Sequence, residues 1–330
     1  MNRSELENSY RGRSVLVTGG LGFMGLNLVS ALRALGSDVR ILSRSALPHV
    51  DGAESIVAGA VVTQGDVRDA SAVDHALADC EYVFHLAGRS GQVMSNLAPL
   101  DDLDVNARGT LTLLMACAER RLSPKFVFPS SRLVYARHLP VPVVESAPLE
   151  PGSVYGLHKL MGEHYLSLYG RLRGLRACAL RITNPYGPFQ RSDQSAYGVI
   201  NWFIHQAMHD RPLTVYGNGP QIRDYVHIDD VVDAMLLAGS RQAADGKVFN
   251  VGGGRGVSFA DMAELVVRVV GAGEVQHVDW PTDAADVETG DFVADTSLIA
   301  GALDWAPTIG LEAGIKDVVA RYRKPASAGS

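Results

Sequence analysis

The fold is decided by the segment Ser14-Val15-Leu16-Val17-Thr18-Gly19-Gly20-Leu21-Gly22-Phe23-Met24-Gly25. Its first residues, Ser14 to Val17, predict a short apolar strand, and the glycine-rich turn after it leads into a helix predicted over Leu26 to Leu35. Glycines in such a turn let the backbone approach a pyrophosphate, whose charge then lies at the positive end of the helix. The order of strand, turn and helix therefore predicts a dinucleotide-binding fold.

The rest of the first half alternates apolar strands with helical segments. This pattern predicts an α/β fold with a Rossmann doubly wound parallel sheet. We expect residues 1–184 to form a dinucleotide-binding domain, with return segments near 226–251, and residues 185–330 to form a smaller α/β substrate lobe. The predicted strands of the first domain after residue 17 span 39–42, 60–64, 82–84, 126–131 and 175–180.

Residues that follow the predicted strands are the candidates for binding a cofactor. The second strand ends at Ser43-Arg44, where an acidic residue would normally bind the ribose hydroxyls of NAD. Arg44 favours NADP, because it could neutralise a ribose phosphate, although a solvated arginine at a strand end is an equally ordinary explanation. Asp66 could accept a hydrogen bond from the adenine amino group. The predicted cofactor-binding residues are Gly19, Gly22, Phe23, Met24, Gly25, Ser43, Arg44, Asp66, Val67, Leu86, Ala87, Gly88, Tyr155 and Lys159.

Three side chains have the chemistry to oxidise an alcohol. Ser131 ends an apolar strand, and Tyr155 and Lys159 are four residues apart, so they share a helix face. A free tyrosine titrates near ~10, and we expect the charges of Lys159 and of a cationic nicotinamide ring to lower the pKa of Tyr155 so that the phenol can act as a base. The Tyr-Lys spacing alone is equally typical of a surface helix. The glycine segment favours the catalytic interpretation.

With these motifs, the chain resembles the extended short-chain dehydrogenases/reductases of the NAD(P)-dependent nucleotide-sugar epimerase/dehydratase family from about Ser14 to Tyr322. The segment 104–110 is similar to a family helix start beneath the nicotinamide, which implies a cofactor role for Asn106. The stretches 181–188 and 219–230 imply that Asn184 and Arg223 hold the diphosphate of a sugar nucleotide. An ion pair that only holds its segment in place is the alternative role for Arg223. The resemblance also implies substrate contacts at Val199, Val215, Tyr216 and Arg132.

The residues after Ser131 indicate which reaction the family resemblance implies. Dehydratases of the family have an Asp-Glu pair there and decarboxylases a Glu, whereas this chain has Arg132 and Leu133. Without that proton carrier, elimination is disfavoured. The resemblance then implies an isomerase of carbohydrate biosynthesis, a 4-epimerase that works through a transient 4-keto sugar with tightly bound NAD(P)+. An NADPH-dependent keto-sugar reductase or dehydrogenase is the alternative, and a non-catalytic cofactor or sugar-nucleotide sensor is a more distant one.

One residue departs from the family pattern. Members usually have an arginine two residues before the Gly-Asp of the C-terminal segment, and this chain has Glu288 before Gly290-Asp291. A glutamate pointing inward would repel a diphosphate. Either Glu288 faces solvent while Arg191 or Arg255 compensates, or it receives hydroxyls of an unusual sugar or base. A surface glutamate in a rearranged loop is equally consistent with the sequence.

Composition and the apolar pattern bear on the expected partners, location and oligomeric state of the protein. The chain has 330 residues and a formal net charge of −6, without a lysine/arginine block, so no nucleic-acid partner is expected. The three cysteines lack metal spacing, no apolar run reaches membrane-spanning length and no leader is evident, which predicts a cytoplasmic enzyme without a metal. The predicted helices 108–120 and 155–172 are apolar on more than one face, and the resemblance implies a homodimer through them. The apolar residues concerned include Leu111, Leu114, Met115, Leu160, Met161, Tyr165 and Leu168.

Overall fold

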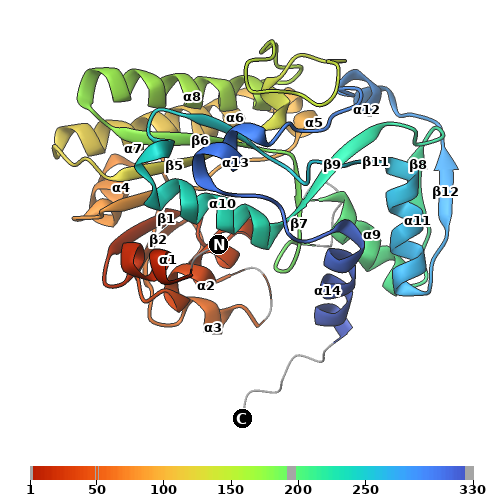
Figure 1. Ribbon diagram of the computed structural model, residues 1–330, viewed down its shortest axis with the longest axis horizontal. Helices are drawn as coiled ribbons and strands as arrows, with labels where there is room; N and C mark the ends of the chain where they lie inside the picture. Colours follow the sequence, from red (N-terminus) through yellow and green to blue (C-terminus); the bar gives the residue numbers. More distant parts are fainter. Residues whose placement is uncertain (1–2, 49, 51, 192–197, 324–330) are drawn as a thin grey trace.

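The computed structural model describes residues 3–48, 50, 52–191 and 198–323. Its centre is a parallel sheet of seven strands in the order β3-β2-β1-β4-β5-β6-β10 (Figure 1). The order reverses between β1 and β4, and a crevice forms where neighbouring connections leave in opposite directions. This confirms the Rossmann doubly wound sheet. The strands are β1 (Ser14–Thr18), β2 (Asp38–Ser43), β3 (Val61–Gln64), β4 (Tyr82–His85), β5 (Lys125–Ser131), β6 (Arg176–Ile182) and β10 (Val248–Val251).

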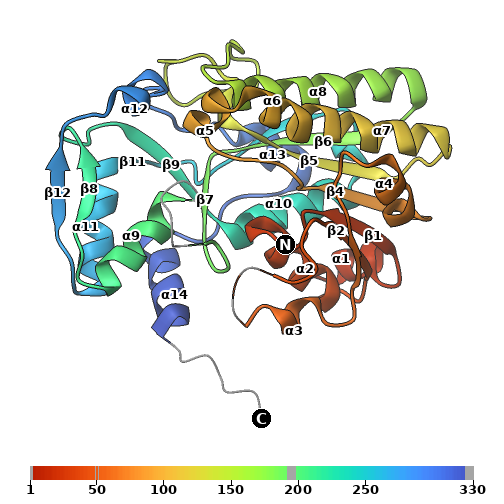
Figure 2. The same ribbon diagram turned by 180° about the vertical axis from the view of Figure 1, so that it is seen from behind.

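Helices cover both faces of this sheet (Figures 1 and 2). One layer contains α1 (Arg3–Tyr10), α2 (Phe23–Ala34), α3 (Glu54–Val57) and α10 (Ile228–Ser240). The opposite layer contains α4 (Ala70–Leu77), α7 (Gly109–Glu119) and α8 (Val154–Arg173). Two further helices, α5 (Gln92–Leu97) and α6 (Pro99–Asp102), pack against α8.

Alternation along the strands explains how one sheet supports two apolar cores. Val15 and Val17 of β1 are buried on the side of α2 and α10, while Leu16 between them is buried on the side of α4 and α7. The same alternation separates Phe126 and Phe128 from Val127 in β5. Successive strand side chains point to opposite faces. Strands buried on both faces are therefore apolar throughout, as the sequence of the first half requires.

A second group of elements lies beside the carboxyl end of the sheet (Figure 1). It contains a sheet of three strands, β7 (Asn184–Tyr186), β9 (Ile222–His227) and β11 (Gly256–Ser258), and a parallel pair, β8 (Leu213–Tyr216) and β12 (Val275–Val278). The helices α9 (Val199–Met208), α11 (Phe259–Val270) and α14 (Leu311–Arg323) share an apolar core with these strands. Between β9 and β11 the chain returns to the seven-stranded sheet and its helices: α10 packs on α2, and β10 pairs with β6. The helices α12 (Thr282–Asp286) and α13 (Ser297–Leu303) lie between β12 and α14 in the sequence.

Two features differ from the sequence prediction. No strand was predicted at β7 or β9, because β7 contains Pro185 and β9 carries charged residues at consecutive positions, and such sequences are weak strand signals. The helix predicted to begin at Arg108 is instead preceded by a π-helical turn, Leu103–Arg108, and α7 begins at Gly109. π-Helical turns are rare and are frequent at functional sites. This one carries Asn106.

A buried ion pair fastens α8 to the sheet. Arg181 on β6 donates from Nε and Nη2 to Glu163 on α8, at 3.0 and 2.7 Å. The hydroxyl of Ser130 on β5 donates to the same carboxylate at 2.5 Å, and Arg181 also donates to the Tyr135 hydroxyl at 3.0 Å. Both charged side chains are almost fully buried. One hydrogen-bonded network thus connects β5, β6 and α8.

We expect Arg181→Met to lower the free energy of unfolding by about 3–5 kcal/mol, because it leaves the Glu163 carboxylate buried without its counter-charge. Lys316→Met is the matched control, since its partner Glu312 is exposed and such a pair contributes about 0–1 kcal/mol. Urea unfolding of both variants measures the difference. Equal losses would show that the buried pair has no special role.

Candidate active site

The glycine turn after β1 fits a dinucleotide pyrophosphate. Gly19 has a φ of +68°, and a side chain there would meet the backbone nitrogen of Ala87 at 2.8 Å. A Cβ at Gly25 would overlap the carbonyl oxygen of Gly19. α2 begins at Phe23, and its N-cap, Gly22, makes no side-chain hydrogen bond to the first amides. Those amides are free to bind an anion at the positive end of the helix.

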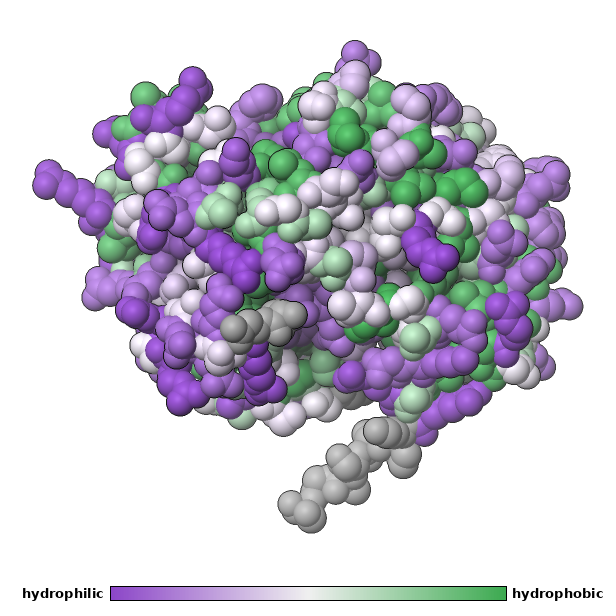
Figure 3. Space-filling model, in the orientation of Figure 1, coloured by the Kyte–Doolittle hydropathy of each residue, from purple (hydrophilic) through white to green (hydrophobic). Residues whose placement is uncertain are grey.

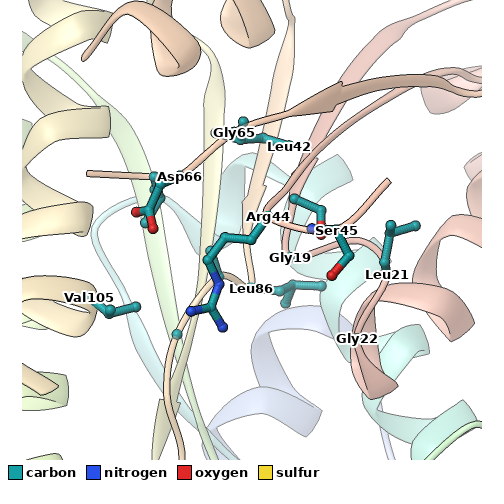
Figure 4. Close-up of a pocket in the computed structure, with 14 residues that line it drawn as sticks. Gly19, Leu21, Gly22, Leu42, Arg44, Ser45, Gly65, Asp66, Leu86 and Val105 are labelled. Carbon is teal, nitrogen blue, oxygen red and sulfur yellow. Dashed lines mark hydrogen bonds between the residues drawn. The ribbon is translucent and has the colours of Figure 1, made fainter. Parts of the chain in front are cut away.

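Two adjoining cavities lie against this turn and contain nearly all the predicted cofactor residues. Figure 4 shows Arg44 reaching into the first cavity from the end of β2, with Asp66 at the same cavity wall. The second cavity extends towards Tyr155 and Lys159. The predicted residues that line one or both are Gly19, Gly22, Phe23, Met24, Gly25, Ser43, Arg44, Asp66, Val67, Leu86, Ala87, Gly88, Tyr155 and Lys159.

The Asp66 carboxylate is held by a neighbour that the sequence prediction missed. Arg68 donates from Nε and Nη2 to the two carboxylate oxygens, at 2.9 and 2.8 Å, and its backbone amide donates at 2.9 Å. These hydrogen bonds hold the pKa of Asp66 below its usual value. Asp66 therefore stays ionised as a fixed acceptor at the cavity wall. A carboxylate has more acceptor sites than this arginine occupies.

Asn106 lies behind the cofactor cavities rather than in their lining. Its Oδ1 accepts from the Arg89 amide at 2.9 Å, while its Nδ2 donates to the Arg89 carbonyl at 3.1 Å and to Asp102 at 2.9 Å. A Cβ on Gly88 would lie 2.7 Å from Asn106 Oδ1. Asn106 thus fixes the loop after β4, and this loop forms a wall of the cavities.

Ser131, Tyr155 and Lys159 meet in a third cavity of about 450 Å³. Ser131 ends β5, and its hydroxyl lies within hydrogen-bonding reach of the Tyr155 phenol. Tyr155 lies in the first turn of α8, which Ser153 caps by accepting from the Gly156 amide at 3.2 Å. Lys159 Nζ donates to the Pro129 carbonyl at 2.9 Å and lies 5.8 Å from the centroid of the Tyr155 ring. Tyr155 and Lys159 also line the second cavity, so the two spaces meet at these residues.

Burial shifts the pKa values of Tyr155 and Lys159. It raises the pKa of Tyr155 well above the ordinary value; the nearby Asp102 adds to the shift, and the hydrogen bond with Ser131 opposes it. Burial lowers the pKa of Lys159 to about 8, against the attraction of Asp102 and Glu163. The lowered pKa was predicted for Tyr155 beside both Lys159 and a cationic nicotinamide ring. In the protein without ligands the pKa is raised instead, because loss of hydration disfavours the phenolate.

The predicted substrate residues are divided between the cavity and its surroundings. Asn184, Val199 and Arg132 line the third cavity, and Asn184 donates to the Asp224 carbonyl at 2.8 Å. The Val215 side chain is fully buried in the apolar core of the second group of elements, so it makes no wall of this cavity. Tyr216 packs its ring 5.3 Å from the ring of Trp280.

Arg223 is not in the cavity lining, because it pairs with Glu288. The guanidinium donates to Glu288 Oε1 at 2.5 Å and to the Gly290 carbonyl at 2.8 Å, and the same carboxylate oxygen accepts from the amides of Thr289 and Gly290. Glu288 therefore binds Arg223 within the chain, an arrangement that the sequence did not predict, and its predicted contact with substrate hydroxyls stays a prediction. The neighbouring Asp224 instead accepts from backbone amides, including that of Ala294 at 2.9 Å.

Several residues that line the third cavity were not predicted, and two of them carry unpaired hydroxyls. Thr183 and Tyr225 are both buried, and among the described residues neither side-chain oxygen has a hydrogen-bond partner. Both line the cavity. Tyr225 lies two positions from Arg223 on β9, so the two share a face of the strand. That spacing was the available signal for Tyr225.

Comparisons with known proteins give the family of this chain. The model of the NAD-dependent epimerase/dehydratase family matches residues 15–252. A putative UDP-glucose 4-epimerase of Methanocaldococcus jannaschii is 33% identical over 308 residues, which cover 92% of this chain and 97% of that protein.

Solved structures are similar over the same length. UDP-glucose 4-epimerase from Thermotoga maritima, solved with UDP-glucose, superposes with a TM-score of 0.87 at 30% identity over 94% of this chain and 98% of that one. The Thermus thermophilus UDP-glucose 4-epimerase complex with NAD gives 0.83 at 31% identity over 94% and 99%. The protein belongs to the NAD-dependent epimerase/dehydratase family.

Proposed function

We propose that the protein is a nucleotide-sugar 4-epimerase that keeps NAD bound through its turnovers. The observation that carries the proposal is that Ser131, Tyr155 and Lys159 line one cavity, while Tyr155 and Lys159 also line the cavity at the glycine turn. A substrate alcohol in the third cavity and a nicotinamide in the second cavity would meet at the Tyr155 phenol. The relatives named UDP-glucose 4-epimerase support a UDP sugar as substrate.

The proposed chemistry assigns each side chain a task. Tyr155 takes the proton of the sugar 4-hydroxyl, and Ser131 hydrogen-bonds the same oxygen. NAD+ held at the glycine turn would supply reversible hydride transfer at C4, and its positive charge would offset the burial that disfavours the Tyr155 phenolate. The 4-keto sugar turns over between the two transfers, while Asn184 and Arg223 hold the diphosphate. Lys159 binds the cofactor ribose.

The proposal also assigns tasks to the two parts of the chain. Residues 1–184, with the return segments near 226–251, hold the cofactor, and residues 185–330 bind the sugar nucleotide. A keto-sugar reductase that consumes NADPH is the second candidate. Arg44 in the first cavity favours it, because an arginine there could bind a ribose phosphate.

Turnover without added cofactor tests the function. We expect the purified protein to carry NAD+ and to convert UDP-glucose into its C4 epimer with no nicotinamide supplied. Tyr155→Phe should retain the cofactor and lose about 10²–10⁴-fold in rate, because only the general base is removed. Chromatography of the sugar nucleotides measures conversion, and absorbance of the released cofactor measures its content. A requirement for stoichiometric NADPH would favour the reductase, and wild-type turnover by Tyr155→Phe would remove the mechanism.

Arg223→Leu tests the diphosphate contact. We expect the Kd of UDP-glucose to rise about 10–100-fold, since a charge-assisted contact is worth roughly 1.5–3 kcal/mol. The structural alternative, in which Arg223 only binds Glu288, predicts a lower melting temperature with unchanged affinity. Glu288→Gln is the matched control: it removes the competing charge and should tighten binding. Calorimetric titration and thermal unfolding of the same preparations separate the two roles.

We further propose a cytoplasmic homodimer. The described residues contain no helix with the length and apolar character needed to cross a bilayer, and all three cysteines are buried thiols. Leu157, Leu168 and Leu172 on α8 and Met115 on α7 are exposed. The face of the molecule drawn in Figure 3 is a mosaic of hydrophilic and hydrophobic residues. Apolar residues on the outer face of two adjacent helices suit a two-fold helix-to-helix contact.

Light scattering at micromolar concentration should give a dimer mass, and Leu168→Lys should give a monomer, because it places a charge in the apolar contact. Val144→Lys changes an exposed apolar residue away from α7 and α8 and serves as the control. A monomer mass for the unmodified protein would refute the proposed interface.

A further inference from the structure

Arg132 is a buried arginine without a carboxylate partner. Among the described residues it forms no ion pair, and its one side-chain hydrogen bond runs from Nη1 to the Thr289 hydroxyl at 2.9 Å. Its guanidinium carbon lies 5.5 Å from the centroid of the Phe292 ring. The buried Arg181, in contrast, is bound by Glu163. A guanidinium has five donors, so most of the hydrogen-bonding capacity of Arg132 is unused.

A buried cation in this condition is costly unless an anion meets it. Burial and the neighbouring Arg223 lower the pKa of Arg132 to about 10, so the group remains charged at neutral pH. The nearby Glu288 and Asp224 attract it without forming an ion pair with it. Glu288 is bound by Arg223, and the Asp224 oxygens accept from backbone amides. A buried charge in a protein is ordinarily paired. The counter-charge of Arg132 is therefore expected from a ligand.

The walls around Arg132 supply further donors. Arg132, Thr183 and Tyr225 line the same cavity, and both hydroxyls lack a partner among the described residues. Each of these three side chains is more than nine-tenths buried. A guanidinium and two unpaired hydroxyls in the wall of one cavity suit a planar oxyanion, which accepts several hydrogen bonds.

The place of Arg132 in the chain indicates which part of the substrate it meets. It follows Ser131 directly, and Ser131 is the residue proposed to bind the oxygen at C4 of the sugar. In a hexopyranose, C5 with its C6 substituent is the neighbour of C4, whereas C1 with the diphosphate lies across the ring. Arg223, the proposed diphosphate contact, is near enough to lower the pKa of Arg132, but it does not line this cavity. Arg132 is the one arginine among the described lining residues.

From this cluster we propose that Arg132, with Tyr225 and Thr183, binds a carboxylate at C6 of the sugar, so that the preferred substrate is a nucleotide-linked uronic acid. The proposal rests on the proposed 4-epimerase function and adds the class of sugar. A hydroxymethyl group at C6 would fill the same space without neutralising the guanidinium.

A matched pair of substrates tests the proposal. UDP-glucuronic acid and UDP-glucose differ only in a carboxylate or a hydroxymethyl group at C6, and kcat/KM is measured for both with the protein carrying its cofactor. We expect a preference of at least about tenfold for UDP-glucuronic acid. Arg132→Gln should reduce that preference about 10–100-fold, as expected for loss of a charge-assisted contact. Arg132→Lys, which keeps the charge, should retain part of it.

The outcomes separate this inference from the function beneath it. Equal losses for both sugars in Arg132→Gln would assign Arg132 to the diphosphate and overturn the inference, as would an unchanged ratio. Turnover of UDP-glucose without a preference for the acid would also overturn it and leave the epimerase intact. If neither UDP sugar is bound or converted, the proposed function itself fails. Should Arg132→Gln not fold, Tyr225→Phe removes one hydroxyl only and should reduce the same preference.

Discussion

The ion pair between Glu163 and Arg181 is the interaction on which the candidate site depends. It ties α8 to β6, and the Ser130 hydroxyl brings β5 into the same network. Ser131 stands next to Ser130 at the end of β5, and α8 carries Tyr155 and Lys159. The three reactive groups come from two separate elements, so their distances are fixed only if those elements cannot slide. A buried, bidentate charge pair resists sliding more strongly than apolar contacts, because any movement exposes unpaired charge to a medium without water.

Three buried arginines near the cavity show how the same side chain can serve structure or binding. Arg181 is matched by Glu163 and is satisfied without a ligand. Arg223 is matched by Glu288, whose carboxylate also binds two backbone amides and therefore keeps partners if the guanidinium turns away. Arg132 forms no ion pair with any carboxylate among the described residues, although Glu288 and Asp224 lie near it. The degree of internal pairing falls from the sheet towards the cavity, and the need for a charge from outside rises in the same order.

Structural features that depend on short, local sequence patterns could be predicted from the sequence. The order of strand, glycine turn and helix at Ser14 to Gly25 was sufficient for the sheet, because each signal lies within one βα unit. It could not predict that Glu288 pairs with Arg223, since 65 positions separate them and only the folded chain brings them together. It also could not predict that the pKa of Tyr155 is raised in the protein without ligands, because the depth of burial is a tertiary property. The short strands β7 and β9 were missed for a related reason: pairing with each other, rather than residue preference, makes them strands.

Glu288 gives the site a property that a second arginine would not. With two arginines, a diphosphate would meet unopposed positive charge, and binding would draw on the full attraction. If Arg223 holds the diphosphate as proposed, the diphosphate competes with a carboxylate 2.5 Å from Arg223, and the net affinity is the difference between two ion pairs. The competition also keeps Arg223 oriented before the substrate arrives, which lowers the entropy lost on binding. An epimerase needs such moderation, because the sugar must detach and turn while the diphosphate remains held. A diphosphate contact of moderate strength suits this rotation of the sugar. The pairing of Glu288 with Arg223 would moderate the contact in this way.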